Sequence, residues 1–206
     1  MRNKWGLAGM TLIVVGLLIC AWNSYAWWQS SQSVHSIDAE STLARQPEKV
    51  EKKSLPFHQL STLKHDYKKG EKVAQLTIPK IDARFDVFWG SDEATLRKGV
   101  GMYVSKWTTT PNSVSGHTVL SGHRNTVFRG LRNLVKGDPL TVNYQGEIYT
   151  YRITKIWITD PDDRSVIVRK QEPTLTLTTC YPFDYIGNAP KRYIVKAELG
   201  TEGQVP

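Results

Sequence analysis

The sequence predicts an all-β domain, either a closed barrel or a sandwich, that follows one apolar N-terminal helix and a polar connector. Two observations carry this prediction. About eight short runs rich in Val, Ile, Thr and aromatic residues, separated by turn residues, lie between residues 73 and 199. The first 28 residues contain instead one continuous apolar segment. Many short strands with little helical periodicity are typical of barrels and sandwiches.

The apolar segment runs from Trp5 to Trp28 and contains no Asp, Glu, Lys or Arg. Its 24 residues would form a helix about 36 Å long, enough to cross a hydrocarbon core of about 30 Å. Arg2 and Lys4 precede the segment, so the positive-inside rule places residues 1–4 in the cytoplasm. We therefore expect a transmembrane anchor over residues 5–28, in a single-pass cell-membrane protein whose folded domain is extracellular.

A cleaved signal peptide is the alternative interpretation of the same segment. Ser24-Tyr25-Ala26 has small residues at the spacing of a cleavage site, and basic residues precede the apolar stretch. The bulky aromatic residues around that site and the length of the stretch favour an uncleaved anchor. Both interpretations place the rest of the chain outside the cytoplasm.

The composition of residues 29–70 predicts an extracellular linker. The segment is rich in Ser, Gln, Lys and Glu and has few large apolar residues before Leu55, so it has little surface to bury. A short helix near Phe57, leaning on the domain, is compatible with the pattern. The folded domain is then expected over residues 71–206, a size that suits one domain with its own core.

The formal net charge of +8 raises the question of nucleic-acid binding. The basic residues are scattered, however, with no arginine-rich run and no basic motif interleaved with aromatic residues. We therefore expect no nucleic-acid partner. A basic extracellular domain is attracted in a general way to anionic lipid headgroups and acidic wall polymers.

The elements of the domain are expected in the following order. Predicted strands are Val73–Pro79, Phe85–Gly90, Thr118–Gly122, Pro139–Tyr144, Glu147–Thr159, Val166–Arg169, Thr174–Cys180 and Arg192–Leu199. Gly146 predicts a hairpin turn after the fourth run, because glycine readily takes the positive φ that such turns need. Helical signal is thin and is confined to residues 92–98 and 126–134.

Cys180 stands at the end of a predicted strand, and the only other cysteine, Cys20, lies in the apolar N-terminal segment. A lone thiol in an oxidising compartment is a candidate for reactivity or intermolecular pairing. Alternation along the strand puts Leu175 and Leu177 on one face and Cys180 on the other. The leucines mark the core face, so Cys180 is expected to point away from the core, which disfavours a buried structural role.

A thiol nucleophile needs a base or a cationic neighbour. His117 and His123 both follow a glycine at a strand boundary, and the residues alone do not choose between them. Arg192 lies on the strand face opposite Tyr193 and Val195, where it is either a solvated arginine or an oxyanion stabiliser. The sequence has no zinc-binding pattern, so neither a metal nor a cofactor is implied.

Three motifs in this order resemble the sortases, the membrane-anchored transpeptidases of Gram-positive bacteria. T-L-T-T-C ends at Cys180, Gly122-His123 lies upstream, and Arg192 follows the cysteine by 12 residues. The resemblance covers residues 73–200. Two longer stretches are most like the sequences of class D sortases of bacilli and clostridia: S-G-H-R-N-T-V-F and C-Y-P-F-D-Y-I-G-N-A-P-K-R-Y-I-V. The histidine precedes the cysteine, which is the reverse of the order in papain-like proteases.

The resemblance implies a closed eight-stranded β-barrel with short helices and a groove at strand ends. Cys180 would attack the Thr carbonyl of an L-P-x-T-[GA]-like sorting signal and form a thioacyl enzyme. His123 would act as general acid and then as base, Arg192 would stabilise the oxyanion or hold the substrate, and Thr179 would help to shape the substrate pocket. An amine of a peptidoglycan precursor would then take up the protein, which becomes anchored to the cell wall. His117 becomes a bystander.

By the same resemblance, the segment between Trp157 and Pro173 would help to bind the sorting signal. Its acidic residues Asp160, Asp162 and Asp163 could hold calcium, as in some class A relatives, although nearby carboxylates more often cap a turn or face solvent. The alternative function is a membrane-tethered, non-catalytic β-domain that binds cell-wall polymer and whose cysteine is inert.

Overall fold

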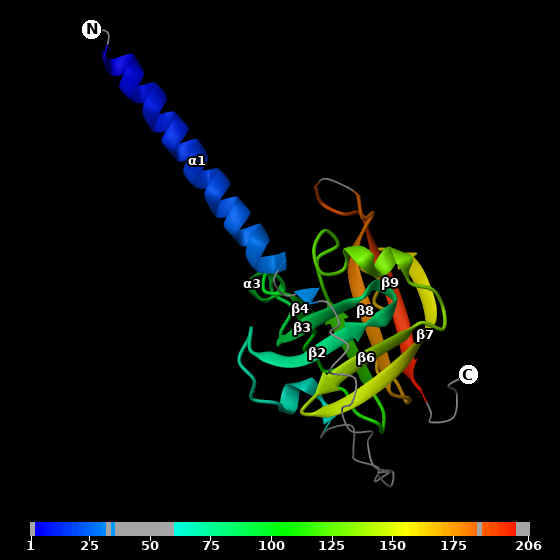
Figure 1. Ribbon diagram of the computed structural model, residues 1–206. Coiled ribbons are helices and arrows are strands. Elements are labelled where there is room, and N and C mark those ends of the chain that lie inside the picture. The colour runs from blue at the N-terminus through cyan, green and yellow to red at the C-terminus, as the bar shows by residue number, and fades with distance from the viewer. Residues whose placement is uncertain (1–2, 32–33, 36–59, 185–186, 201–206) are drawn as a thin grey trace.

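The computed structural model describes residues 3–31, 34–35, 60–184 and 187–200 (Figure 1). Helix α1 (Asn3–Ser31) extends away from a β-barrel that the rest of the described chain forms. In the part of the chain that the structure describes, no helix combines the length and the hydropathy needed to cross a membrane. The transmembrane anchor over residues 5–28 therefore stays a prediction.

Eight strands form the barrel. They are β2 (Lys72–Ile78), β3 (Ala83–Trp89), β4 (Val100–Met102), β5 (His117–Ser121), β6 (Pro139–Tyr144), β7 (Glu147–Thr159), β8 (Thr174–Tyr181) and β9 (Lys191–Leu199). Their order is β3-β2-β6-β7-β9-β8-β5-β4, and pairing of β4 with β3 closes the ring. The β3–β4 and β5–β8 pairs are parallel and the others antiparallel. A two-residue strand, β1 (Val34–His35), adds to β3. The closed eight-stranded barrel is thus confirmed.

Seven of the eight predicted runs are strands, and one is not. Residues 166–169 have strand-forming side chains but belong to a segment, 160–173, that contains no strand and lies between β7 and β8. The eighth barrel strand is instead β4, which is only three residues long and carries Gly101 at its centre. A Cβ on Gly101 would lie 2.4 Å from the carbonyl oxygen of Gly90, so close backbone contact selects glycine here and removes the β-forming signal.

The barrel interior is filled by alternate residues of the strands. Its largest fully buried side chains include Leu76, Phe85, Leu140, Tyr151, Ile153, Leu175 and Leu177. The turn between β6 and β7 has positive φ at both Gln145 and Gly146 (53° and 84°), which confirms the predicted hairpin. Short helices precede or connect the strands: η2 (Thr62–Lys64), η3 (Pro79–Ile81), α3 (Glu93–Leu96) and η4 (Arg129–Asn133).

The last residues of the predicted linker pack on the barrel. Leu60 and Thr62 are buried, Ser61 bridges to Thr109, and the Thr62 amide donates to the Thr108 carbonyl (3.1 Å). A short helix was expected near Phe57; Phe57 itself lies outside the described residues, and η2 begins at Thr62. Most of the linker, residues 36–59, and residues 201–206 of the predicted domain also lie outside them.

Candidate active site

The antiparallel register of β8 and β9 brings Cys180 and Arg192 together. The two residues are direct cross-strand partners, and both are half-buried at the ends of their strands. Side chains of directly opposed residues project from the same face, with Cβ atoms about 4.5–5.5 Å apart. The Arg192 guanidinium is held by hydrogen bonds to the carbonyls of Lys191 (3.1 Å) and Ala189 (3.4 Å). A thiol and a cationic donor are therefore neighbours because of strand pairing alone.

His123 reaches the same edge of the sheet from β5. The parallel β5–β8 register pairs Ser121 with Thr178, and the Gly122 amide still donates to the Thr178 carbonyl (3.2 Å). His123 and Cys180 each follow this last pair by two residues, so the register brings both residues to the same end of β5 and β8. The His123 carbonyl accepts from the amide of Phe128 (3.0 Å), which forms a turn after the histidine and leads the chain to Phe128, a fully buried residue of the core. All three predicted catalytic residues thus lie at neighbouring strand ends.

Thr179 ties the cysteine strand to the histidine loop. Its side chain is buried, and its hydroxyl donates to the Gly122 carbonyl at 2.6 Å. A Cβ on Gly122 would lie 2.7 Å from Val127, so this glycine permits the close approach. Thr179 was predicted to shape the substrate pocket; its buried hydroxyl influences the site through the position of the Gly122-His123 backbone.

Two arginines that sequence reasoning missed hold the chain between Cys180 and Arg192. Arg132 on η4 makes a bidentate pair with Asp184 (2.7 and 3.0 Å), and Arg124 donates to the Gly187 carbonyl (2.9 Å). The hydrogen bonds from Arg132 lower the pKa of the Asp184 carboxyl. These contacts join the β8–β9 connection to the segment that follows His123. The partners are 52 and 63 residues apart in sequence, so no local pattern indicates them.

His117, the other candidate histidine, lies away from the thiol. It pairs with Thr174, six residues before Cys180 on β8, which corresponds to about 20 Å along a strand. Its ring is fully buried, with Nδ1 2.8 Å from the Val168 carbonyl oxygen and Nε2 2.8 Å from the Thr176 hydroxyl. A carbonyl only accepts, so Nδ1 carries the proton and Nε2 accepts from Thr176. His117 is therefore not placed beside the nucleophile.

The burial of His117 predicts a pH-dependent stability. Burial lowers its pKa from 6.5 to about 4, to which the charges of Lys170 and Lys196 add. The unfolded chain thus binds more protons between these values, so stability is complete above pH 6.5 and falls as the pH drops towards 4. We expect a loss of about 3 kcal/mol over this interval, since one pKa unit corresponds to about 1.36 kcal/mol.

Urea unfolding of the full chain in detergent at several pH values measures this effect. A His117→Asn variant should show a flatter dependence of unfolding free energy on pH between 6.5 and 4. Parallel curves for the wild type and the variant would show that His117 does not carry the effect.

Two of the three acidic residues considered for calcium, Asp160 and Asp163, are engaged in other contacts, and Asp162 is exposed. Asp160 forms an ion pair with Lys191 (2.6 Å), and Asp163 accepts from the Ser165 amide and hydroxyl (2.9 and 2.6 Å) and the Thr159 hydroxyl (2.5 Å). Among the residues described, no group of three or more His, Cys, Asp or Glu side chains is arranged to hold a metal ion. Asp163 thus caps a turn, one of the two roles considered for the trio.

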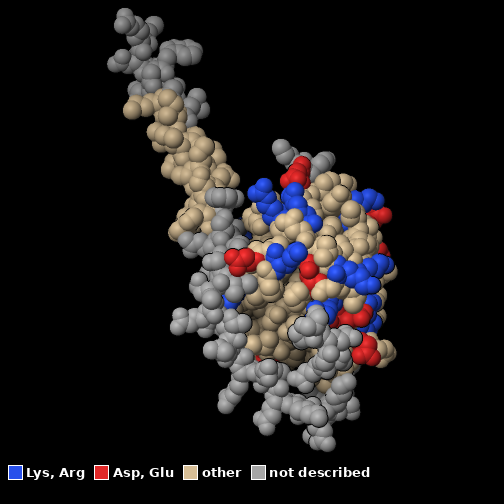
Figure 2. Space-filling model, turned by 45° about the vertical axis from the view of Figure 1, so that its right-hand side comes forward, with Lys and Arg blue, Asp and Glu red and all other residues tan. Residues whose placement is uncertain are grey.

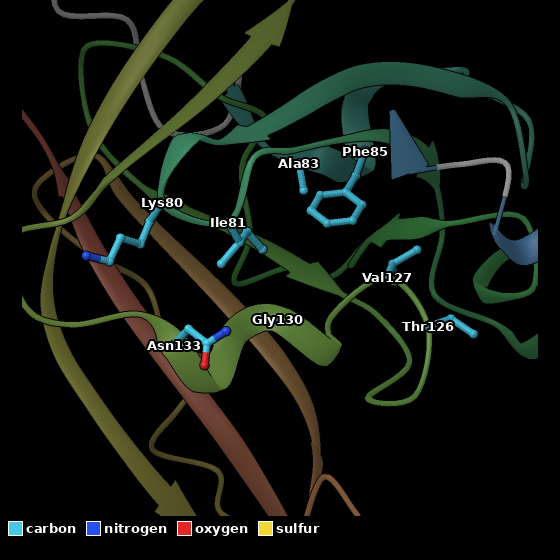
Figure 3. A pocket seen from close by; sticks show the side chains of 8 residues that line it. All are labelled: Lys80, Ile81, Ala83, Phe85, Thr126, Val127, Gly130 and Asn133. Atoms are coloured by element: carbon cyan, nitrogen blue, oxygen red, sulfur yellow. The ribbon is translucent and has the colours of Figure 1, made fainter. Parts of the chain in front are cut away.

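An open pocket of about 320 Å³ lies between β3 and η4 (Figure 3). Its lining residues are Lys80, Ile81, Ala83, Phe85, Thr126, Val127, Gly130 and Asn133. None of Cys180, His123 and Arg192 is among them, although Thr126 and Val127 follow the histidine closely. The candidate catalytic residues therefore lie outside this pocket, at strand ends.

The charged residues of the barrel are distributed as the sequence indicates. On the face seen in Figure 2, Lys and Arg side chains form several separate groups with Asp and Glu between them. The ion pairs Lys72–Asp86 (2.8 Å) and Lys196–Glu198 (2.7 Å) are examples of this mixing. This face carries no continuous basic strip of the kind that follows a nucleic-acid backbone.

Comparison with known proteins identifies the class to which this fold and site belong. A model of the Sortase domain family matches residues 76–200. The chain belongs to the sortase family. The resemblance drawn from the motifs around Cys180, His123 and Arg192 is therefore confirmed.

The relatives point further, to class D. The chain is 47% identical to Sortase D of Bacillus subtilis (strain 168) over 127 residues, which cover 61% of this chain and 63% of that protein. It is 30% identical to Sortase SrtE1 of Streptomyces coelicolor over 190 residues, covering 84% of this chain and 52% of that one. The chain thus spans less than two thirds of either relative's length.

Solved structures agree with this assignment. The catalytic domain of Bacillus anthracis SrtD matches with a TM-score of 0.58 and 59% identity, over 67% of this chain and 93% of that chain. A Clostridium perfringens Sortase D5 transpeptidase matches with a TM-score of 0.59 and 28% identity, over 71% and 90% of the two chains. These similarities support a class D sortase.

Proposed function

We propose that this protein is a cysteine transpeptidase that cleaves an L-P-x-T-[GA]-like sorting signal after Thr and transfers the acyl portion to an amine of a peptidoglycan precursor. It thereby anchors surface proteins to the cell wall. The proposal is supported by the strand register, which pairs Cys180 with Arg192 and brings the end of β5, just before His123, to the same end of β8, in a chain of the sortase family.

In the first half-reaction, the Cys180 thiol gives its proton to His123, its sulfur attacks the Thr carbonyl carbon and a C–S bond forms. The carbonyl electron pair moves onto oxygen, where the Arg192 guanidinium stabilises the negative charge. The C–N bond then breaks, and the leaving amine takes a proton from His123. The product is a thioester between the substrate Thr and Cys180, together with the released C-terminal peptide.

In the second half-reaction, the acceptor amine attacks the thioester carbon and gives a proton to His123. Arg192 stabilises the oxyanion again, and Cys180 leaves as a thiolate, which takes back the proton from His123, while the new amide forms. One amide bond is broken and one is made, so the exchange requires no external energy source. His123 and Cys180 return to their starting state for the next cycle.

The proposed location is the cell membrane, with residues 1–4 cytoplasmic, residues 5–28 as a single-pass anchor, residues 29–70 as an extracellular linker and residues 71–206 as the extracellular catalytic domain. The described apolar side chains of α1 support the anchor, since Ile13 and Leu17 are 65% and 64% exposed. Such a surface suits lipid contact. The proposed partners are sorting-signal proteins, a peptidoglycan amine and the membrane, with no nucleic acid.

A peptide panel tests the proposal. The full chain in detergent is incubated with L-P-x-T-G and L-P-x-T-A peptides and a free amine, and products are identified by mass spectrometry. We expect cleavage after Thr and a product in which the amine is joined to Thr. Binding of wall polymer without turnover of any peptide would favour the non-catalytic β-domain instead.

A further inference from the structure

A second buried layer lies outside the barrel. Val119 and Ile194 are 0% and 1% exposed, yet they do not belong to the barrel core. Their neighbours Leu120 and Val195 point into the core, so Val119 and Ile194 point outward. Their burial therefore requires a cover on the outer face of β5, β8 and β9.

The segment 160–173 supplies that cover. Its Val168 carbonyl contacts the outward-pointing His117, and its Val166 side chain is buried without belonging to the barrel core. Thr174 and Thr176, on the outer face of β8, are 3% and 2% exposed. The alternation predicted along β8 is correct, but from Thr174 to Leu177 the outer face of the strand is buried as well as the core face.

The cover borders the candidate active site. Thr176, Thr178 and Cys180 share one face of β8, so the covered face leads directly to the thiol. The segment begins beside the arginine, because Thr159 pairs with Arg192 and Asp160 forms an ion pair with Lys191. Segment 160–173 therefore forms one wall of the surface next to Cys180.

His117 links segment 160–173 to β8 through hydrogen bonds. Residues 160–173 contain no strand or helix, so no ladder of backbone hydrogen bonds fixes their position. The imidazole bridges two elements: Nδ1 donates to the Val168 carbonyl, and Nε2 accepts from the Thr176 hydroxyl, each at 2.8 Å. The bridge is buried, where a hydrogen bond is not exposed to competition from water.

We propose that His117 is a positioning residue that, as a neutral imidazole, holds segment 160–173 against β8 and so shapes the groove for the acyl-donor peptide. The inference rests on the proposed function. A donor of four residues needs about 13 Å of extended groove, whereas the acceptor presents a single amine. Loss of the bridge should therefore weaken donor binding and leave the use of the acceptor unchanged.

Three substitutions at His117 separate its two hydrogen bonds. His117→Asn retains a donor near the position of Nδ1, His117→Gln retains an acceptor near Nε2, and His117→Leu retains neither. We expect His117→Gln and His117→Leu to raise the KM for the donor peptide about tenfold, as loss of one buried hydrogen bond implies. His117→Asn should stay within about threefold of the wild type. The kcat and the KM of the amine should change little in all three.

His65→Gln is the matched control, since His65 is a half-buried histidine that stacks on Tyr67, outside this layer. Donor KM values for His117→Gln and His117→Leu equal to the wild type would overturn the proposal. Parallel falls in kcat and melting temperature in all three variants, with donor KM unchanged, would also overturn it and leave a purely structural role.

Hydrogen exchange of the full chain without substrate gives a second readout. The backbone amides of residues 164–172 should exchange faster in His117→Gln than in the wild type. If the His117 variants do not fold, Thr176→Val, which removes the hydroxyl that His117 contacts, replaces them in the same measurement. Unchanged exchange there would overturn the inference. This arm is independent of the proposed function, which fails separately if the wild type turns over no sorting peptide.

Discussion

Replacing Cys180 by alanine should lower the rate of peptide cleavage and of transfer to the amine by at least about 10⁴-fold, because the nucleophile is removed. Cys180→Ser should be nearly as inactive. An alcohol is far less ionised than a thiol at neutral pH, and nothing in the covalent step compensates for this. Mass spectrometry of the joined product measures both variants.

Cys20→Ala is the matched control for Cys180. Cys20 is the only other thiol and lies on α1, whereas Cys180 lies on β8. The control should retain full activity, and intact-mass measurement should detect the acyl adduct in it but not in Cys180→Ala. A joined product formed by Cys180→Ala at the rate of the wild type would contradict the proposed mechanism.

Replacing Arg192 by alanine is expected to lower kcat by about 10²–10³-fold, the usual cost of removing one donor to a developing oxyanion. Arg192→Lys should recover only part of this loss. A single ammonium keeps the charge but does not reproduce the planar fork that is held over the Lys191 and Ala189 carbonyls. Steady-state kinetics with saturating amine measure both effects.

Arg97→Ala is the comparison for Arg192, since Arg97 is exposed and pairs with Glu93 at the short helix α3. We expect its kcat to match that of the wild type. If Arg192→Ala raised only the donor KM and left kcat intact, Arg192 would bind substrate without stabilising the oxyanion. If neither parameter changed, the assignment of Arg192 would be wrong.

Local pattern predicts most of this fold. Seven strands and the Gln145-Gly146 turn follow from alternation and turn chemistry within short windows. The failures have one physical cause, which is tertiary context. Residues 166–169 carry β-forming side chains because they cover a packed face, and β4 lacks them because Gly101 must approach Gly90 closely. In both segments the residue types are determined by contacts with residues distant in sequence, which a short stretch of sequence does not reveal.

The candidate site is predictable to a different extent. Alternation around Leu175 and Leu177 predicts that Cys180 points away from the core, whereas a role for Arg192 is indicated only by the resemblance to the sortases. Residue chemistry alone does not separate His123 from His117, since both follow glycine. The structure places His123 by register at the strand end and His117 inside the outer layer. The Arg132–Asp184 pair depends on contacts across 52 residues, which local pattern does not encode.

The parallel pairing of β5 with β8 has a consequence for the order in which the protein folds. His123 and Cys180 are 57 residues apart, and they meet only after the intervening β6 and β7 have folded back and β8 has docked on β5. Such non-local pairing forms late in folding. Before that docking, the Cys180 thiol lacks the neighbouring imidazole of His123. The three residues of the candidate site therefore come together only when the barrel is complete.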